Sequence, residues 1–306
     1  MCPPGGNPHP ISTINVKLYN SAAELYSNLK RGNIDLINTN NIDYETYIGT
    51  IGFNANISPD REFDYMAINT ADNILSKKEV RQAINYAIDK NNIIYNVYKN
   101  KYSVSNFPLD NGNYLYDKGN DTQSYNLDKA KSVLTNNGWV YQNNTWRKSG
   151  SILNFNLIVQ ASNGDRVLAA QNIQQQLGDI GIKINIIEVS DASYQSYIKN
   201  KNYELMLTGN VVPLGPDLSS YFGQDNLFNY DNADIDSILK EVDDIQDATL
   251  LKEKYKSILD IYDEDVPFIS LYFNPNISIA SPAIKGVINH NFDNIFYNID
   301  SWYKTI

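Results

Sequence analysis

The sequence FDYMAINT at residues 63–70 and the sequence SKKEVRQAINYAIDK at residues 76–90 decide the fold of this chain. The first predicts a short strand that ends on the amide side chain of Asn69. In the second, apolar residues recur every three or four positions, which predicts a helix with one apolar face. Ser76 and Glu79 have the spacing of a capping box, which places the start of this helix at Ser76.

The rest of the chain alternates between the periods of strands and helices. Asp89 is placed to cap a second helix that starts at Lys90. Alternating apolar residues predict further strands at residues 14–19, 34–37, 153–159, 182–189, 203–209 and 266–274. Apolar residues at helical spacing predict helices near residues 21–30, 125–134, 163–180, 194–200, 232–242 and 250–263. This order of elements predicts an α/β protein with mixed sheets.

The composition argues against two classes of protein. The chain has 306 residues, of which 42% are hydrophobic and 20% charged, which is typical of a globular protein with one or two domains. Its formal net charge is −10, and no cluster of lysine and arginine supplies the positive surface that nucleic acid binding needs. No run of about 18 apolar residues predicts a membrane-spanning helix, and no signal peptide is recognisable.

Cysteine and histidine are scarce. Cys2 is the only cysteine, so no disulfide can form within the chain. Its position after the first methionine fits the lipid-bearing residue of a mature lipoprotein, and it fits an added expression leader equally well. His9 and His290 are too isolated for a metal site, and we expect neither a metal nor another cofactor.

The motifs of common enzymes are absent. The chain has no Gly-x-Ser-x-Gly elbow, phosphate-binding loop, Cys-x-x-Cys or His-Glu-x-x-His. Paired carboxylates such as Asp243 and Asp244 are typical of a solvated helix surface, although a glycosidase also needs two carboxylates. We therefore expect a protein without catalysis, and a hydrolase on an α/β scaffold is the weaker alternative.

Three motifs carry a family resemblance. The strand that ends in Asn69 precedes Val-Arg-x-Ala-x-x-Tyr-Ala-Ile-Asp-Lys at residues 80–90. A helix that begins near Tyr125 ends before the pair Gly-Trp, and Val-Pro-x-Ile-x-Leu-Tyr begins at Val266. With these motifs the chain resembles the family 5 extracellular solute-binding proteins, the peptide- and nickel-type receptors of ABC importers.

The resemblance implies a fold, a function and a location. The fold would be α/β and periplasmic-binding-protein-like (class II), with two lobes that close on an oligopeptide or another small polar solute. The partners would be this ligand and the permease subunits of an ABC importer, and the protein would be a monomer. It would be extracellular, held at the cell surface by a lipid on Cys2, or periplasmic.

The resemblance also predicts the domain boundaries. Residues 1–12 would be a flexible leader rich in proline and glycine. Residues 13–68 and 276–306 would form part of the first lobe, and residues 69–275 would form the second lobe. Whole members of the family are longer at the N-terminus, so the first lobe would be incomplete and would expose a sheet edge.

Seven residues are predicted to contact the ligand. They lie on strands that would cross between the lobes or in the loop at residues 213–222, and they combine aromatic rings with oriented polar groups. A single asparagine at a strand end is more often a turn former or a cap, so the prediction depends on their joint placement. The predicted ligand-binding residues are Tyr65, Asn69, Asn210, Asp217, Tyr221, Tyr272 and Asn274.

One loop departs from the family pattern. The resemblance implies an Asp-Pro pair whose aspartate binds the α-ammonium group of a peptide, but this chain has Gly215 before Pro216 and Asp217 after it. Either Asp217 replaces that aspartate with a different geometry, or the protein does not bind a free peptide amine in this way. The alternative function is a ligand sensor or interaction domain without transport, which would fit a module cut from a fusion protein.

Overall fold

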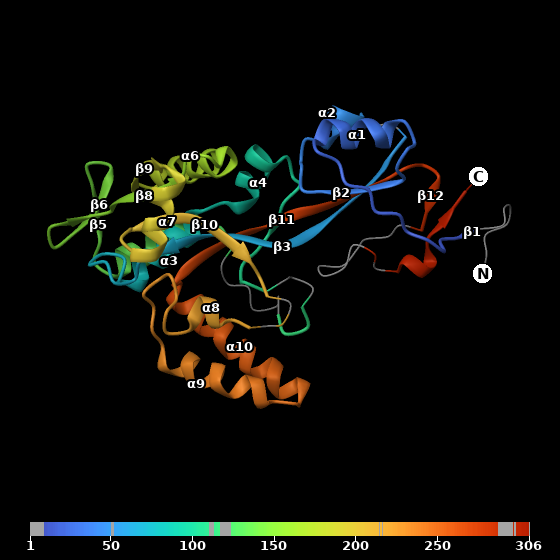
Figure 1. Cartoon of the computed structure of the whole chain (residues 1–306). Coiled ribbons are helices and arrows are strands. Elements are labelled where there is room, and N and C mark those ends of the chain that lie inside the picture. The colour runs from blue at the N-terminus through green and yellow to red at the C-terminus, as the bar shows by residue number, and fades with distance from the viewer. Residues whose placement is uncertain are drawn as a thin grey trace. The chain divides into compact units, whose positions relative to one another are not determined.

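The computed structural model describes residues 9–49, 52–109, 113–116, 124–213, 215, 217–286, 296 and 298–305. Contacts divide the chain into two units, whose elements are labelled in Figure 1. Unit 1 comprises Met1–Arg61, Lys101–Ser103 and Asn274–Ile306, and unit 2 comprises Glu62–Asn100 and Val104–Phe273. Two long strands, β3 (Asn54–Ile68) and β11 (Phe268–Ala280), begin in one unit and end in the other.

Unit 2 is built on a mixed sheet with helices on both faces. Besides parts of β3 and β11, its sheet strands are β8 (Asn154–Gln160), β9 (Lys183–Val189) and β10 (Leu205–Val211). A separate small sheet consists of β5 (Val140–Gln142), β6 (Thr145–Lys148) and β7 (Ser151–Ile152), and the short β4 (Ser103–Val104) pairs with β11. The helices are α3 (Lys78–Ala87), α4 (Lys90–Tyr98), α5 (Leu127–Asn136), α6 (Gly164–Asp179), α7 (Asp191–Asn200), α8 (Ser219–Phe222), α9 (Ala233–Glu241) and α10 (Ala248–Asp265).

The strand order of the unit 2 sheet is β11-β3-β10-β8-β9. Strand β8 is parallel to both β9 and β10, whereas β10 is antiparallel to β3. The register between β10 and β3 runs from Leu205 opposite Ile68 to Val211 opposite Glu62. The prediction of an α/β protein with a mixed sheet is therefore confirmed.

Helix α6 connects the parallel strands β8 and β9 and packs on them, as Figure 1 shows. Asn163 caps its N-terminus by accepting from the backbone N–H of Arg166. Gly181 lies in the turn before β9 with a φ of +84°, and a Cβ atom there would lie 2.4 Å from a ring carbon of Tyr141. The buried residues of α6 have the helical spacing predicted from the sequence and are Ala169, Ala170, Ile173 and Leu177.

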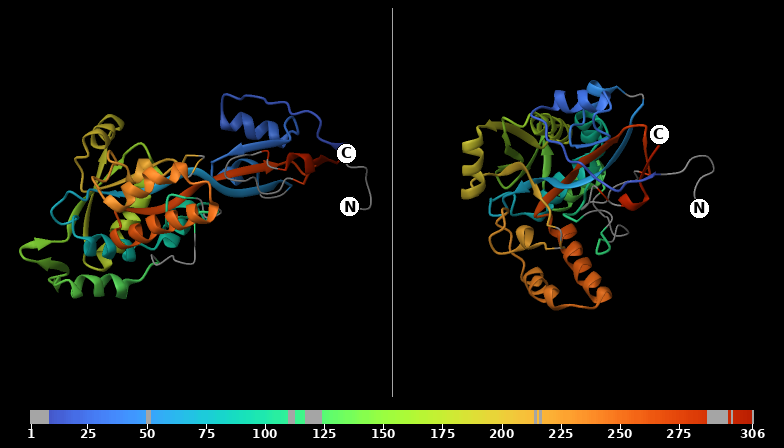
Figure 2. Two further views of the ribbon diagram at one scale, coloured as in Figure 1. Left: turned by 90° about the horizontal axis from the view of Figure 1, so that it is seen from below. Right: turned by 45° about the vertical axis from the view of Figure 1, so that its right-hand side comes forward.

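Aromatic side chains fill the face of the unit 2 sheet that α8 and α10 cover. Phe63 and Tyr65 of β3 stack with 5.3 Å between ring centroids, and Tyr65 meets Tyr221 of α8 at 6.0 Å. Phe268 at the start of β11 stacks on Phe228 at 4.5 Å. All five rings are buried. Figures 1 and 2 show α9 and α10 side by side in the same part of unit 2.

Buried tyrosines make the protein sensitive to alkaline pH. Burial raises the pKa of the phenol groups of Tyr65, Tyr221, Tyr262 and Tyr272 above the ordinary value of 10.0, and it raises that of Tyr255 to about 12. Because the folded protein holds these protons more tightly than the unfolded chain does, their contribution to stability is complete below about pH 10 and is lost as the pH rises above it.

We therefore expect the protein to unfold as the pH is raised from about 10 to about 12. Circular dichroism measures the loss of structure, and near-ultraviolet absorbance measures the phenolate formed. The two signals are expected to change together. Complete phenolate absorbance in a protein that keeps its circular dichroism spectrum would contradict the prediction.

Unit 1 is smaller and contains the helices α1 (Ala22–Lys30) and α2 (Tyr44–Ile48). Strand β2 (Leu36–Thr39) pairs antiparallel with β11 and corresponds to the strand predicted at residues 34–37. A second sheet has the order β1 (His9–Pro10), β13 (Tyr303–Lys304) and β12 (Ile284–Lys285), and a 3₁₀ turn, η3 (Ile299–Ser301), precedes β13. The core of unit 1 consists of Tyr26, Leu29, Ile37, Tyr44, Ile48, Ile277 and Ile279.

The strand predicted at residues 14–19 is not formed. These residues have no regular secondary structure, and the side chains of Ile14, Val16 and Leu18 are 50%, 79% and 93% exposed. Their alternation fits a strand, but no strand in the described part of the chain pairs with them. A pattern without a neighbouring strand does not make a sheet, because strand preference depends on cross-strand packing.

Two smaller predictions have different outcomes at the ends of helices. The capping box predicted at α3 is wrong, because the helix starts at Lys78 and Ser76 donates its hydroxyl to the carbonyl of Asn73 instead. The cap predicted at α4 is confirmed, because Asp89 accepts from the backbone N–H of Asn92.

The two units differ from the predicted domain boundaries by a few residues. The prediction assigns residues 62–68 to the first lobe, but they pair with β10 and belong to unit 2. Asn274 and Pro275, predicted in the second lobe, belong to unit 1. His9 and Pro10 form β1 although they lie within the predicted leader, whose first eight residues, with Cys2, are outside the described part.

Candidate ligand site

The loops that follow the parallel strands of unit 2 lie at one edge of its sheet. Strands β8, β9 and β10 end at Gln160, Val189 and Val211, and parallel strands have their carboxyl ends at the same edge. Strand β3 is antiparallel to β10, so residues 62–64 also lie there. In open α/β sheets, ligands bind outside the carboxyl ends of the strands. We call this region the carboxyl edge, and it is the candidate site.

A buried ion pair connects two elements at the carboxyl edge. Arg166, in the first turn of α6, donates from Nε to Oδ2 of Asp64 at 3.0 Å and from Nη2 to Oδ1 at 2.7 Å. The side chains of Asp64 and Arg166 are only 9% and 17% exposed. Burial alone would lower the pKa of the Arg166 guanidinium, but the hydrogen bonds and charge of Asp64 outweigh it and raise this pKa above its ordinary value. Arg166 is therefore fixed in place and charged.

Gly209 leaves room for this ion pair. It lies opposite Asp64 in the register of β10 and β3, and a Cβ atom there would lie 2.3 Å from Asp64 Oδ1 and 2.6 Å from Arg166 Nη2. Atoms without a hydrogen bond do not approach this closely, so β10 needs glycine where the ion pair crosses it.

Substitution of Gly209 with alanine is expected to lower the free energy of unfolding by about 1–3 kcal/mol, because the ion pair must shift. Gly178 is a matched control, since it lies in α6 and a Cβ atom there would meet nothing within 4 Å. Gly178→Ala is expected to raise the free energy of unfolding by about 0.5–1 kcal/mol, because alanine favours a helix. Urea unfolding measures both, and equal effects at the two glycines would refute the role of Gly209.

Three of the predicted ligand-binding residues lie at the carboxyl edge. The hydroxyl of Tyr221, which is buried, donates to Oδ1 of Asn210 at 3.0 Å. Asn210 is half-buried, and its amide nitrogen donates to no group among the described residues. Asp217 is exposed and accepts from the backbone N–H of Ser219 at 2.8 Å, which orders the start of α8. Asn210 thus offers the N–H groups of its amide to a ligand, and Asp217 offers the oxygens of its carboxylate.

Two other predicted residues are buried within unit 2. The ring of Tyr65 packs against that of Tyr221 in the aromatic layer. The hydroxyls of Tyr272 and Tyr98 are hydrogen-bonded at 2.7 Å. Burial raises the pKa of both Tyr65 and Tyr272, which keeps them neutral. Tyr65 therefore supports Tyr221 from inside the unit, whereas Tyr272 is bonded to Tyr98 of α4.

The last two predicted residues lie elsewhere. Asn69 follows the opposite end of β3, where its Nδ2 donates to the carbonyl of Tyr203 at 2.9 Å and its Oδ1 accepts from Asn229 at 2.9 Å. Its side chain therefore holds a turn together. Asn274 is half-buried and belongs to unit 1. The structure does not bring Asn69 together with the other predicted residues of unit 2.

Sequence reasoning misses Asp64 and Arg166. Asp64 lies between two aromatic residues in a predicted buried strand, and a charged residue at such a position signals a buried partner. The partner, Arg166, is 102 residues further along the chain, and its own surroundings predict only the start of a helix. One sequence contains no signal that links the two.

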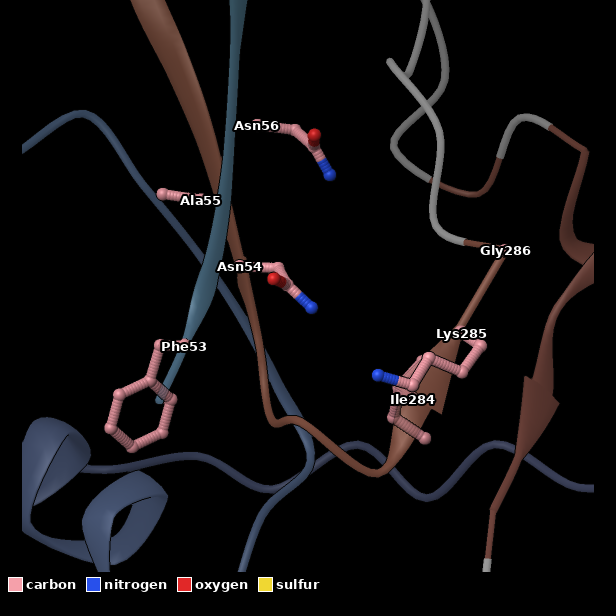
Figure 3. Close-up of a pocket in the computed structure, with 7 residues that line it drawn as sticks. All are labelled: Phe53, Asn54, Ala55, Asn56, Ile284, Lys285 and Gly286. Carbon is pink, nitrogen blue, oxygen red and sulfur yellow. The ribbon is translucent and has the colours of Figure 1, made fainter. Parts of the chain in front are cut away.

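An open pocket of about 460 Å³ lies in unit 1. Figure 3 shows Asn54 and Asn56 on the side of the chain that faces the strand carrying Lys285, whereas Phe53 and Ala55 point the other way. Phe53 packs against the core of unit 1, which accounts for this alternation. The pocket is polar and open, unlike the largely apolar clefts that hold small molecules, and none of the predicted ligand-binding residues lines it.

Two kinds of feature are absent from the described residues. No group of three or more histidine, cysteine, aspartate or glutamate side chains in this part of the chain could hold a metal ion. None of the helices described above has both the length and the apolar composition needed to cross a membrane.

The sequence matches a family model over most of its length. The family is described as bacterial extracellular solute-binding proteins, family 5 Middle, and the match covers residues 5–230. The chain belongs to this family. The predicted resemblance is therefore confirmed, and so is the prediction of a binding protein in place of an enzyme, because family 5 is a family of solute-binding proteins.

Two relatives show how much of a family 5 protein this chain represents. The oligopeptide-binding protein AppA of Bacillus subtilis (strain 168) is 28% identical over 97% of this chain and 57% of its own length. Heme-binding protein A of Haemophilus influenzae (strain ATCC 51907 / DSM 11121 / KW20 / Rd) is 26% identical over 77% of this chain and 44% of its own length. The chain thus spans about half the length of these relatives.

Solved structures of family 5 proteins have the same fold. AppA from Bacillus subtilis in complex with a nonapeptide has a TM-score of 0.72 at 25% identity, over 92% of this chain and 58% of that one. HbpA2 from Haemophilus parasuis has a TM-score of 0.79 at 22% identity, over 94% of this chain and 57% of that one. These similarities confirm the predicted periplasmic-binding-protein-like fold.

Proposed function

We propose that this chain is a substrate-binding component of an ABC importer that captures an oligopeptide or another small polar solute without changing it. Membership of family 5 supports a binding function, and an oligopeptide-binding protein is among the similar proteins. The observation that carries the proposal is the carboxyl edge of unit 2, where Asn210 and Asp217 offer polar groups next to the buried Tyr221. The permease of the importer would be the protein partner.

Asn210, Asp217 and Tyr221 are the residues proposed to bind the ligand from unit 2. The carboxylate of Asp217 would attract the ammonium group of a peptide through a charge-assisted hydrogen bond. The amide of Asn210, held by the Tyr221 hydroxyl at 3.0 Å, would donate to a carbonyl group of the ligand. This arrangement suits a polar ligand whose position is fixed by a few oriented groups.

Thermal unfolding with and without a mixed peptide library tests the proposal. A ligand that binds only the folded protein adds RT ln(1 + [L]/Kd) to its stability, so we expect a higher midpoint and recovery of bound peptide by mass spectrometry. Asp217→Ala is expected to abolish the rise. Asp179→Ala, at the last residue of α6, is the matched control and is expected to leave the rise unchanged. An unmoved midpoint without recovered peptide would refute peptide capture.

We also propose that the protein works outside the cytoplasm, either extracellularly or in the periplasm, and that Cys2 carries a lipid anchor. The family description supports an extracellular location. Metabolic labelling with a fatty acid in the native host tests the anchor. Label that is incorporated into the unsubstituted protein and lost in Cys2→Ser would support it, and a protein without label would refute it.

A further inference from the structure

The ion pair between Asp64 and Arg166 leaves one end of the guanidinium open. Nε and Nη2 of Arg166 donate to Asp64, but Nη1 donates to no group in the part of the chain that the structure describes. The Arg166 side chain keeps 17% of its surface exposed, and Nη1 is not among the buried atoms without a partner. Arg166 therefore presents two N–H groups, in an orientation fixed by Asp64, to whatever lies at the carboxyl edge.

The segments that form the carboxyl edge carry more acidic than basic residues. Arg166 is the only basic residue in the three segments that follow β8, β9 and β10, which are residues 161–166, 190–192 and 212–218. The acidic residues in the same segments are Asp165, Asp191 and Asp217. Asp64 adds a further negative charge at 2.7 Å from the guanidinium. The carboxyl edge therefore carries a net negative charge although it contains an arginine.

We propose that Arg166 donates to an uncharged carbonyl oxygen of the ligand, and that the carboxyl edge does not bind a carboxylate. The proposal rests on the function proposed above. A carboxylate would gain little from a guanidinium whose charge Asp64 already balances, and the net negative charge of the carboxyl edge would repel it. A peptide or amide carbonyl accepts the same N–H groups without this repulsion.

The proposal defines the class of ligand group at this edge. The ligand group bound at the carboxyl edge is the main chain of a peptide or the amide of another solute. Any free carboxylate of the ligand lies elsewhere or is absent. Arg166 is then a specificity-determining residue, because an arginine without Asp64 beside it would favour a carboxylate through a charge-assisted hydrogen bond. Gly209 contributes indirectly, because it leaves the space in which Asp64 and Arg166 pair.

The proposal is tested with one pentapeptide library made in two forms. One form has a C-terminal carboxylate, and the other has a C-terminal carboxamide. The rise in thermal midpoint at equal library concentration gives the relative affinity of the two forms for the full chain. We expect the carboxamide form to bind at least as tightly as the carboxylate form. A preference for the carboxylate above roughly threefold would overturn the proposal, since one charge-assisted hydrogen bond corresponds to about tenfold.

A double substitution tests whether Arg166 is the residue that makes the contact. Asp64→Leu with Arg166→Leu removes both charges, and such replacements often leave a protein folded. We expect this variant to bind both library forms more weakly, by the same factor of roughly three to ten. Weakening of the carboxylate form alone, or of neither form, would overturn the proposal. The comparison on the unsubstituted chain stands whether or not the variant folds.

The experiment distinguishes failure of the proposed function from failure of the role proposed for Arg166. If neither library form raises the midpoint of the unsubstituted chain, peptide capture is refuted and the role of Arg166 falls with it. If both forms bind and the carboxylate form binds more tightly, peptide capture holds and only the role of Arg166 is overturned.

Discussion

Asp64→Asn is expected to lower the free energy of unfolding by about 3–5 kcal/mol. The substitution keeps the size of the side chain, but it removes the charge that balances Arg166, whose side chain is largely buried. A largely buried guanidinium would then face a neutral amide in place of the carboxylate, and this loss is a large share of the roughly 5–15 kcal/mol that stabilises a folded domain. Urea unfolding followed by circular dichroism measures the difference.

Asp260→Asn is the matched control for this substitution. Asp260 also accepts from a basic side chain at 2.7 Å, that of Lys256, but this pair lies on α10 with both side chains about half exposed. Exposed pairs contribute little, so the free energy of unfolding is expected to change by no more than about 0.5 kcal/mol. Similar losses in the two variants would mean that burial does not set the cost of breaking an ion pair in this protein.

Arg81→Met is expected to lower the free energy of unfolding by about 3 kcal/mol or more. Arg81, on α3, is 4% exposed, and within the described part of the chain its guanidinium forms no ion pair and donates to main-chain carbonyls, those of Leu75, Ser76, Asp265 and Val266. Methionine fills a similar length but donates nothing, so buried carbonyl groups at two separate places lose their partners.

Arg81 also holds an unusual main-chain conformation at the end of α10. Val266 has a φ of +46°, which is unfavourable for a β-branched residue, and Arg81 Nε donates to its carbonyl at 3.1 Å. The positive guanidinium further compensates the negative end of the α10 dipole. The turn that leads into β11 therefore depends on a side chain from a helix far away in the sequence.

Lys131→Met on the exposed surface of α5 is the control for Arg81→Met. It removes one positive charge without removing a buried donor, so the change is expected to stay within about 0.5 kcal/mol. Urea unfolding measures both variants. An Arg81→Met protein as stable as Lys131→Met would show that these carbonyl groups find other partners.

Local periodicity predicts the elements of unit 2 well because their neighbours are present in the chain. The stripe of apolar residues on α6 and the alternation in the first half of β8 both correspond to buried faces in the structure. The same reasoning fails at residues 14–19, where the alternation is as regular but none of the described strands lies alongside. Periodicity shows which secondary structure a segment is able to form. Whether the segment forms it depends on a neighbouring strand or helix, which the segment's own sequence does not reveal.

The candidate site is predictable only in part for the same reason. Asn210, Asp217 and Tyr221 lie close together in the sequence, at the end of a predicted strand and in the loop at residues 213–222 that follows it. Asp64 and Arg166 depend on a contact between a strand and a helix that are 102 residues apart, and neither residue has a local motif. Loops can be located from the sequence, whereas long-range polar pairs require the fold.

The pairing of β2 with β11 has a consequence for biosynthesis. Residues 36–39 are translated before their partners at residues 277–280, and the whole of unit 2 is translated between them. Until β11 has been made, α1, α2 and β2 lack the strand against which β2 pairs. During this time their apolar side chains, and the exposed Ile14, Val16 and Leu18, are not covered by it. Nascent chains of this protein are therefore expected to depend on chaperones until β11 emerges, and a chain released before that point would be prone to aggregation.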